Sequence, residues 1–121
     1  MSKLILVVED ERDQRELLLE LLHEEGGYRA IGAATAKGAL EAVAHECPAL
    51  VVCDLLLPDG DGREVCKRVN EICPEPPPFI FLTGVAPTKT QDVEQKTLRK
   101  PVDVDAFLAM VERHVSRRPR T

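Results

Sequence analysis

The stretch LVVCDLLLPDGDG, residues 50–62, runs from a wholly apolar segment, Leu50 to Cys53, directly into a carboxylate, Asp54. A short apolar run next to turn-forming residues is typical of a strand that is buried on both faces of a sheet. Pro58 and Gly62 follow the carboxylate and favour a turn. The stretch therefore predicts a buried strand, with Asp54 at its carboxyl end.

Apolar runs alternate with helical segments along the rest of the chain. Strands are expected at Leu4–Val8, Tyr28–Ala33, Leu50–Cys53 and Phe79–Leu82, and helices at Asp13–Glu24, Ala36–Ala44, Arg63–Ile72 and Val104–Arg117. Such alternation is typical of a parallel sheet with helices on both faces. The sequence thus predicts an α/β fold.

The helical segments carry apolar stripes and end signals. The stripes are Leu17, Leu18, Leu21 and Leu22 in the first helix, and Phe107, Leu108, Val111 and Val115 in the last. Gly26-Gly27 is expected to end the first helix. Thr35 and Asp103 are placed to cap the second helix and the last one.

Size and charge limit the classes of function. The chain has 121 residues, 44% of them hydrophobic and 31% charged, which suits one globular domain over residues 1–121, with 118–121 as a tail or linker. The net charge of -5 argues against direct nucleic-acid binding. No apolar stretch is long enough for a signal peptide or a membrane span, so a cytoplasmic protein without membrane contact is expected.

The four cysteines show no metal-binding spacing. Cys47, Cys53, Cys66 and Cys73 include no C-x-x-C pair, and the histidines lie far from them in sequence. Cys53 is expected to be a small buried residue, and the other three are expected to be helix or loop thiols.

Polar residues follow the predicted strands. Glu9 and Asp10 end the first strand, Asp54 the third and Thr83 the fourth, and Lys100 ends a fifth strand that is expected between Thr83 and Lys100. Ligands of open parallel sheets bind outside the carboxyl ends of the strands, so these side chains are expected to converge. Grouped carboxylates repel one another unless a cation lies among them, and their hard oxygen ligands suit Mg2+. Lys100 and Thr83 could then contact a phosphoryl group.

The sequence resembles the response-regulator receiver family of two-component signalling systems, from Lys3 to about Arg117. The residues that carry the resemblance are Val7–Glu11 (VVEDE), Leu50–Gly62, Leu82–Gly84 (LTG) and Lys100-Pro101. The resemblance implies a flavodoxin-like (CheY-like) doubly wound sheet of five parallel strands, in the order 2-1-3-4-5, with five helices.

The resemblance also implies a role for each residue. Asp54 would be the phosphoacceptor, taking its phosphoryl group from a phosphohistidine of a histidine kinase or phosphotransfer protein. Mg2+ would be bound by Asp10 and Asp54 directly, by Glu9 through water and by the backbone carbonyl of Leu56. Thr83 and Lys100 would contact the phosphoryl oxygens, and the Lys100-Pro101 peptide bond would be cis. Such a domain catalyses only its own phosphorylation and dephosphorylation, and a second copy of the chain is a possible partner.

Three features depart from the family pattern. The position three residues before the lysine is usually aromatic and is Thr97 here. The crossover between Thr83 and Lys100 is shorter than usual and leaves room only for a small fourth helix, at about Thr90–Gln95. Leu56 and Val85 replace residues that are often polar, which predicts slow hydrolysis of the phosphorylated form.

Two other classes of protein are alternatives. A pseudo-receiver, an interaction module not regulated by phosphorylation, would not need the full set of acids, threonine and lysine. A small aspartate-nucleophile phosphatase would need an acid two residues after the nucleophile, where Leu56 stands. The phosphate-binding patterns G-x-x-x-x-G-K and G-x-G-x-x-G do not occur.

Overall fold

The five long strands form one parallel sheet in the order that the family resemblance implied. The computed structural model describes residues 3–84 and 97–116. The strands are β1 (Leu4–Val8), β2 (Arg29–Ala33), β3 (Leu50–Asp54), β6 (Phe79–Thr83) and β7 (Thr97–Arg99). They lie in the order β2-β1-β3-β6-β7, which is 2-1-3-4-5 when these five strands are numbered along the chain. A two-stranded antiparallel hairpin, β4 (Leu56–Leu57) and β5 (Gly60–Asp61), follows β3.

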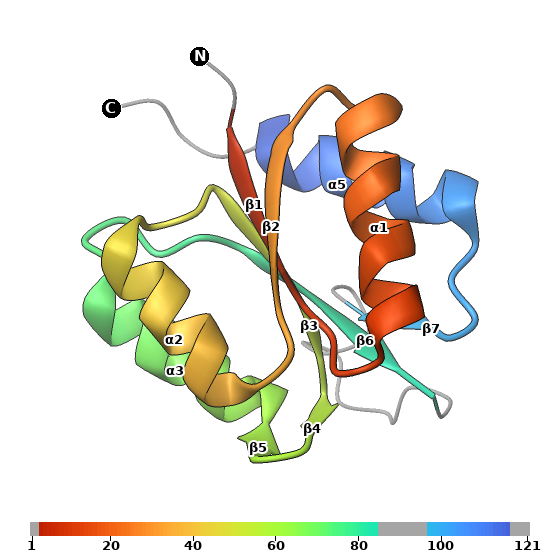
Figure 1. Cartoon of the computed structure of the whole chain (residues 1–121). Coiled ribbons are helices and arrows are strands. Elements are labelled where there is room, and N and C mark those ends of the chain that lie inside the picture. The colour runs from red at the N-terminus through yellow and green to blue at the C-terminus, as the bar shows by residue number, and fades with distance from the viewer. Residues whose placement is uncertain (1–2, 85–96, 117–121) are drawn as a thin grey trace.

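Helices cover both faces of the sheet (Figure 1). The helices are α1 (Arg12–Glu24), α2 (Ala36–His45), α3 (Gly62–Ile72) and α5 (Val104–Ser116). α1 and α5 lie on one face, and α2 and α3 lie on the other. These four are the helices within the described ranges, and the short fourth helix expected at Thr90–Gln95 falls outside them.

The three central strands, β1, β3 and β6, are buried on both faces and are apolar except for Asp54 and Thr83 at their ends. Alternate residues of β1, β3 and β6 point to opposite sides and join two separate cores. One core packs under α1 and α5 and consists of Ile5, Val7, Leu18, Leu22, Leu50, Val52, Ile80, Leu82, Phe107, Val111 and Val115. The other packs under α2 and α3 and consists of Leu6, Val8, Ala39, Val43, Val51, Cys53, Val65, Val69, Cys73, Phe79 and Phe81.

The end signals of the helices are confirmed. Thr35 Oγ1 accepts a hydrogen bond from the amide of Gly38 (3.0 Å), and Asp103 Oδ2 accepts one from the amide of Ala106 (3.2 Å). Gly27, after α1, has a φ of 68°, a left-handed conformation that favours glycine. The stripe predicted in α1 is partly wrong, since Leu17 is 47% exposed while its neighbour Leu18 is fully buried.

The prediction that Cys47 and Cys73 are thiols is wrong, because they form a disulfide. Packing of α2 against α3 brings together two cysteines that are separated by 26 positions in sequence, so no local spacing could indicate the pair. Cys53 is fully buried, as expected, and Cys66 is a partly buried cysteine that is not part of the disulfide.

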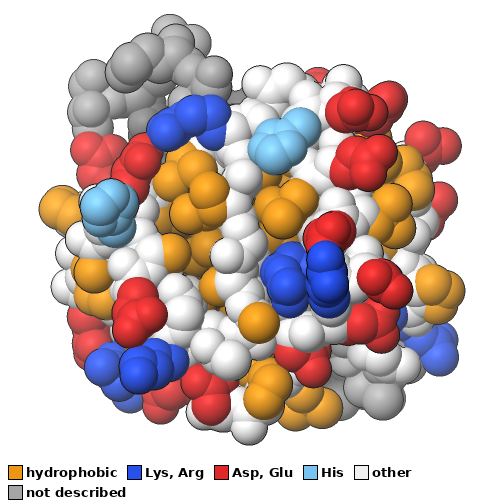
Figure 2. Space-filling view, in the orientation of Figure 1, with side chains coloured by type: hydrophobic (Ala, Val, Ile, Leu, Met, Phe, Trp, Pro, Cys, Tyr) orange, Lys and Arg blue, Asp and Glu red, His pale blue; other side chains and the backbone are white. Residues whose placement is uncertain are grey.

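Charged side chains of both signs are mixed on the molecular face shown in Figure 2. Two exposed ion pairs join side chains of opposite charge: Arg12 Nε to Glu16 Oε2 at 2.9 Å, and Arg29 Nη2 to Glu46 Oε2 at 2.6 Å. Within the described ranges, the helices are all too short or too polar to cross a membrane.

Candidate functional site

The polar residues predicted at the strand ends meet at the carboxyl edge of the sheet. Glu9 follows β1, Asp54 ends β3, Thr83 ends β6 and Lys100 follows β7. The strand register places them side by side, since Asp54 pairs with Leu82, and Thr83 pairs with Arg99. The topology of the sheet alone therefore gathers groups that are far apart in sequence.

Three carboxylates form the centre of this edge. Glu9, Asp10 and Asp54 each offer an oxygen, and the three oxygens lie within 4.8 Å of one another. Glu9 and Asp54 are buried, with 0% and 2% of their surface exposed, whereas Asp10 is exposed. Two buried acids next to each other are unfavourable in the ionised state unless positive charge lies close by.

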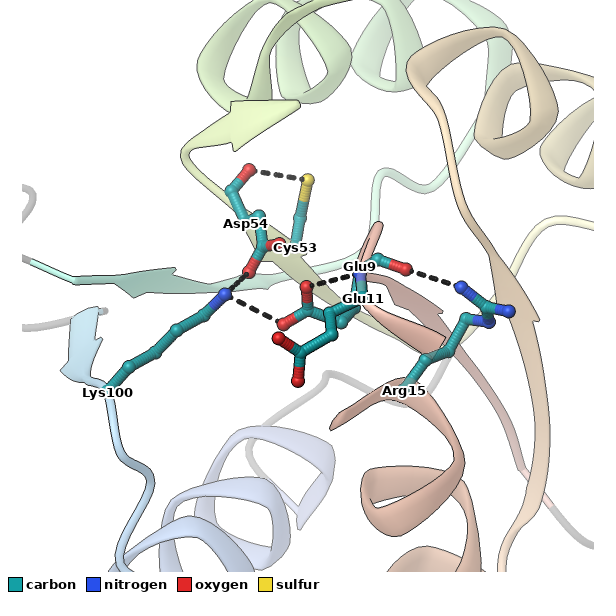
Figure 3. Close-up of polar contacts among 6 residues, drawn as sticks. All are labelled: Glu9, Glu11, Arg15, Cys53, Asp54 and Lys100. Carbon is teal, nitrogen blue, oxygen red and sulfur yellow. Dashed lines mark hydrogen bonds and ion pairs between the residues drawn. The ribbon is translucent and has the colours of Figure 1, made fainter. Parts of the chain in front are cut away.

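Lys100 supplies positive charge to the two buried acids. Its Nζ lies 2.8 Å from Glu9 Oε1 and 2.8 Å from Asp54 Oδ1, so that one ammonium bridges both carboxylates (Figure 3). The Lys100 side chain is 29% exposed and reaches the acids from the end of β7. The ammonium of Lys100 thus offsets part of the negative charge of the three carboxylates.

Backbone contacts fix Glu9 and the end of β7. Oε2 of Glu9 accepts a hydrogen bond from the amide of Glu11 (3.0 Å), and the carbonyl of Glu9 accepts one from Arg15 Nη1 (2.9 Å) (Figure 3). The amide of Lys100 donates to the carbonyl of Thr83 (2.7 Å), and the Lys100-Pro101 bond is cis, as the family resemblance implied. These contacts orient the acid and the lysine before any ligand binds.

The two buried acids differ in acidity. Burial, followed by the hydrogen bond and charge of Glu9, raises the pKa of Asp54 to about 7, although Lys100 opposes the shift. Burial alone would raise the pKa of Glu9 too, but hydrogen bonds from Asp54, Lys100 and the Glu11 amide outweigh it and lower that pKa. In the metal-free site near neutral pH, Asp54 therefore holds the shared proton more strongly than Glu9 does.

The cluster fits a divalent cation. When both buried acids are ionised, Oδ2 of Asp54 is buried and receives no hydrogen bond from the described residues. A cation beside it would offset the excess negative charge, and carboxylate oxygens are the ligands that Mg2+ prefers. Glu9, Asp10 and Asp54 would hold the ion.

The remaining predicted residues lie around the cluster. Thr83 is 7% exposed at the end of β6. Leu56, whose carbonyl was predicted to bind metal, lies on β4 two residues after Asp54, and its side chain is 83% exposed. Thr97, which stands at the usual aromatic position, is 7% exposed at the start of β7. Val85 lies outside the described residues.

Gly62 lets the chain turn back against the phosphoacceptor candidate. Its amide donates to the carbonyl of Leu55 (2.8 Å), and a Cβ at this position would overlap the backbone carbonyl oxygen of Asp54. Asp61 then caps α3, with Oδ1 accepting from the amide of Arg63 (2.7 Å). The glycine is required because the backbone approaches so closely.

Asp59 links the β4–β5 hairpin to the start of α2, a contact that was not predicted from the sequence. Its Oδ1 and Oδ2 accept hydrogen bonds from the amides of Ala36 (2.7 Å) and Lys37 (3.1 Å) at the start of α2. The residue therefore ties the β4–β5 hairpin to a helix 22 or more positions away. An aspartate in a turn could have suggested a cap, but only the tertiary structure shows which helix it caps.

A family model for the response regulator receiver domain matches residues 5–112. The chain belongs to the response regulator receiver domain family. The receiver protein CpdR of Brucella abortus is 30% identical over 116 residues, covering 92% of this chain and 95% of CpdR. An uncharacterized 14.6 kDa protein of Leptolyngbya boryana is 35% identical over 116 residues, covering 91% of this chain and 88% of the relative. A CheY-like receiver domain from Methanospirillum hungatei has the same fold, with a TM-score of 0.85, 25% identity and 98% and 97% of the two chains covered.

The raised pKa of Asp54 leads to a prediction about the stability of this receiver domain in the absence of metal. Because its pKa is raised by folding, Asp54 contributes stability that is present below about pH 4 and is lost as the pH rises through about 7. At alkaline pH the ionised Asp54 side chain therefore destabilises the folded protein, and Asp54→Asn removes this cost. In EDTA at about pH 8, the variant is expected to melt roughly 5 °C or more above wild type, and the gap should close at about pH 4. Thermal unfolding across this pH range measures it, and a variant less stable than wild type at the alkaline end contradicts the prediction.

The link between Asp59 and α2 leads to a second prediction, with a matched control. Asp59→Ala and Thr35→Ala each remove one cap of α2, so both should lower the melting temperature by a few degrees. Only Asp59→Ala should speed hydrogen exchange at the hairpin amides of Leu56, Leu57 and Asp61. Equal exchange rates at these amides in the two variants would show that Asp59 does not hold the hairpin.

Proposed function

We propose that Asp54 accepts a phosphoryl group from a phosphohistidine of a histidine kinase or histidine phosphotransfer protein. A carboxylate oxygen of Asp54 would attack phosphorus, and the phosphorus–nitrogen bond to the histidine would break. The observation that carries the proposal is the position of Asp54, buried at a strand end between a second buried acid and the ammonium of Lys100. Membership of a family that signals by phosphorylation supports it.

In this proposal, Mg2+ is held by Glu9, Asp10, Asp54 and the backbone carbonyl of Leu56. The ion would neutralise the acids and the incoming phosphoryl oxygens. Lys100, which contacts Asp54 Oδ1, would pair with a phosphoryl oxygen, and the Thr83 hydroxyl would donate a hydrogen bond to another. Lys100 and Thr83 would both stabilise the negative charge of the phosphoryl oxygens as this group is transferred to Asp54. They would therefore favour the phosphorylated product as well as the transition state.

The same proposal covers the activity, extent and partners of the domain. Receiver domains are generally not true enzymes, and we propose that this one catalyses only its own phosphorylation and dephosphorylation. Residues 1–121 would be a single receiver domain, cytoplasmic, without direct contact to nucleic acid or membrane. A homodimer is a further proposal, tested by light scattering with and without phosphorylation.

The test uses a small phosphodonor. Wild type incubated with acetyl phosphate and Mg2+ should gain the mass of one phosphoryl group, and EDTA should prevent the gain. Intact-mass spectrometry measures both. An unmodified protein, at donor concentrations that label another receiver domain in the same experiment, would favour the alternative of an interaction module not regulated by phosphorylation.

The phosphorylated form is expected to be long-lived. Hydrolysis requires a water in line with the phosphoryl bond, held by a polar group. The side chain of Leu56 is 83% exposed, so water can reach it, but a leucine offers no hydrogen bond to orient that water. Leu56→Asn should speed decay about tenfold, since one hydrogen bond is worth about 1 kcal/mol, and Leu56→Asn with Val85→Glu should speed it by up to about a hundredfold.

Loss of radiolabelled phosphate in Mg2+, after removal of the donor, gives the decay rate. Leu57→Asn is the control, because it places the same amide on the neighbouring residue of β4. If decay of the Leu56 variants matches that of wild type, the apolar residues do not set the lifetime.

A further inference from the structure

The Cys47–Cys73 disulfide joins the ends of two helices. Cys47 lies in the connection from α2 to β3, and Cys73 follows α3 directly. Their Cα atoms are 6.0 Å apart, a distance usual for bonded cysteines. The two helices lie next to each other on one face of the sheet (Figure 1). The bond therefore fastens this helical layer at one end.

The disulfide lies at the edge of the sheet opposite the acidic cluster. Cys47 precedes β3 and Cys73 precedes β6, whereas Asp54 is the last residue of β3. A strand of this length spans about 13 Å, so the disulfide is remote from the carboxylates. Its chemistry can change without contact with Asp54.

The two bonded cysteines differ in exposure. Cys47 is an exposed residue, whereas Cys73 is 3% exposed and belongs to the core under α2 and α3. A thiolate from solution can therefore attack Cys47 but not Cys73. Cys53, which is not part of the disulfide, is fully buried, and burial, with the charge of Asp54, raises the pKa of its thiol, so it forms little thiolate.

We propose that Cys47 and Cys73 form a reversible thiol–disulfide exchange site, attacked at Cys47 by small thiols or by a protein dithiol, whose state sets the stability of the domain. The attacking thiolate bonds to Sγ of Cys47, the sulfur–sulfur bond breaks, and Cys73 leaves with the electron pair and takes up a proton. A second thiol then displaces Cys47. Two external thiols are oxidised to one disulfide for each protein disulfide reduced, and a small disulfide drives the reverse reaction.

The stability effect follows from the loop that the bond closes. The cross-link spans 26 positions, which include β3, the β4–β5 hairpin and α3. Closing a loop of this size restricts the unfolded chain and should raise the melting temperature by about 10 °C. Reduction should remove this increment. This proposal does not depend on phosphoryl acceptance by Asp54.

The test treats the folded full chain with reduced or oxidised glutathione. After alkylation and digestion, mass spectrometry should find the peptides of Cys47 and Cys73 joined only in the oxidised sample, and the oxidised protein should melt about 10 °C higher. Cys47→Ser, at the exposed position, should melt like reduced wild type under both conditions. Cys66→Ser should respond to glutathione as wild type does.

Three results would overturn the proposal. One is a melting temperature of wild type that is the same in both forms of glutathione. Another is a bond that opens only after the protein is unfolded by denaturant, since the folded protein would then not exchange. The third is a Cys66→Ser variant that no longer responds, because the reactive pair would then include Cys66.

Discussion

Asp54→Asn is expected to abolish phosphoryl incorporation from a small phosphodonor in the presence of Mg2+. The substitution keeps the size of the side chain but removes the ionised oxygen that would attack phosphorus and bind the ion. Asp54 is buried, contacts Lys100 and lies within 4.8 Å of two further carboxylate oxygens. Glu9 shares these features, but its Oε2 accepts a hydrogen bond from the Glu11 amide, whereas Oδ2 of Asp54 receives none from the described residues. Intact-mass spectrometry should therefore show only unmodified variant where wild type is modified.

Asp61→Asn is the matched control for this loss. Asp61 lies in β5 of the hairpin that follows Asp54 and caps α3 through the amide of Arg63 (2.7 Å), and asparagine caps helices about as well as aspartate. The control should incorporate phosphate as wild type does. Full incorporation into Asp54→Asn, or loss of it in Asp61→Asn, would show that another carboxylate accepts the phosphoryl group.

Lys100→Met is expected to slow phosphorylation about a hundredfold at saturating Mg2+. The lysine Nζ contacts Asp54 Oδ1 and Glu9 Oε1 at 2.8 Å each, so the variant loses the one side-chain cation that bridges the buried acids among the described residues. Methionine keeps most of the length of the side chain without its charge. The rate of phosphoryl gain, followed by mass over time, measures the effect.

Lys67→Met serves as the control, since it removes a charge from an exposed position on α3. It should leave the rate unchanged. A near-normal rate for Lys100→Met would mean that the lysine orders the buried acids but does not act on the phosphoryl group.

Most of the sheet could be predicted because its strands are buried on both sides. Runs such as Leu50 to Cys53 and Phe79 to Leu82 have no polar residue, and this pattern indicates a central parallel strand with little ambiguity. The site followed from the same runs, because parallel strands bring their carboxyl ends to one edge. Glu9, Asp10, Asp54 and Lys100 were placed correctly for that reason. Their roles in phosphoryl transfer remain predictions.

Tertiary contacts explain what the sequence could not reveal. Cys47 and Cys73 meet only because α2 packs on α3, and Asp59 reaches α2 only because the β4–β5 hairpin folds towards it. Neither contact has a local spacing that signals it. Leu17 follows the apolar pattern of α1 yet points partly to solvent, since helical periodicity shows an apolar stripe without fixing its edges.

The different acidities of the two buried carboxylates are consistent with a site arranged for a bound cation. A raised pKa at Asp54 means that folding opposes its ionisation, and metal binding would offset this cost. Mg2+ should therefore raise the melting temperature of wild type more than that of Asp54→Asn. Local destabilisation of this kind is common where a structure is built for function.

The most direct measurement locates the phosphoryl group. Wild type phosphorylated from acetyl phosphate in Mg2+ would be reduced with borohydride, which converts an aspartyl phosphate to homoserine, and digested for peptide sequencing by mass spectrometry. We predict homoserine at position 54 and unmodified aspartate at Asp10, Asp59 and Asp61. Homoserine at any of those three positions, or none at position 54 in a protein that has gained phosphate, would contradict the assignment of Asp54 as phosphoacceptor.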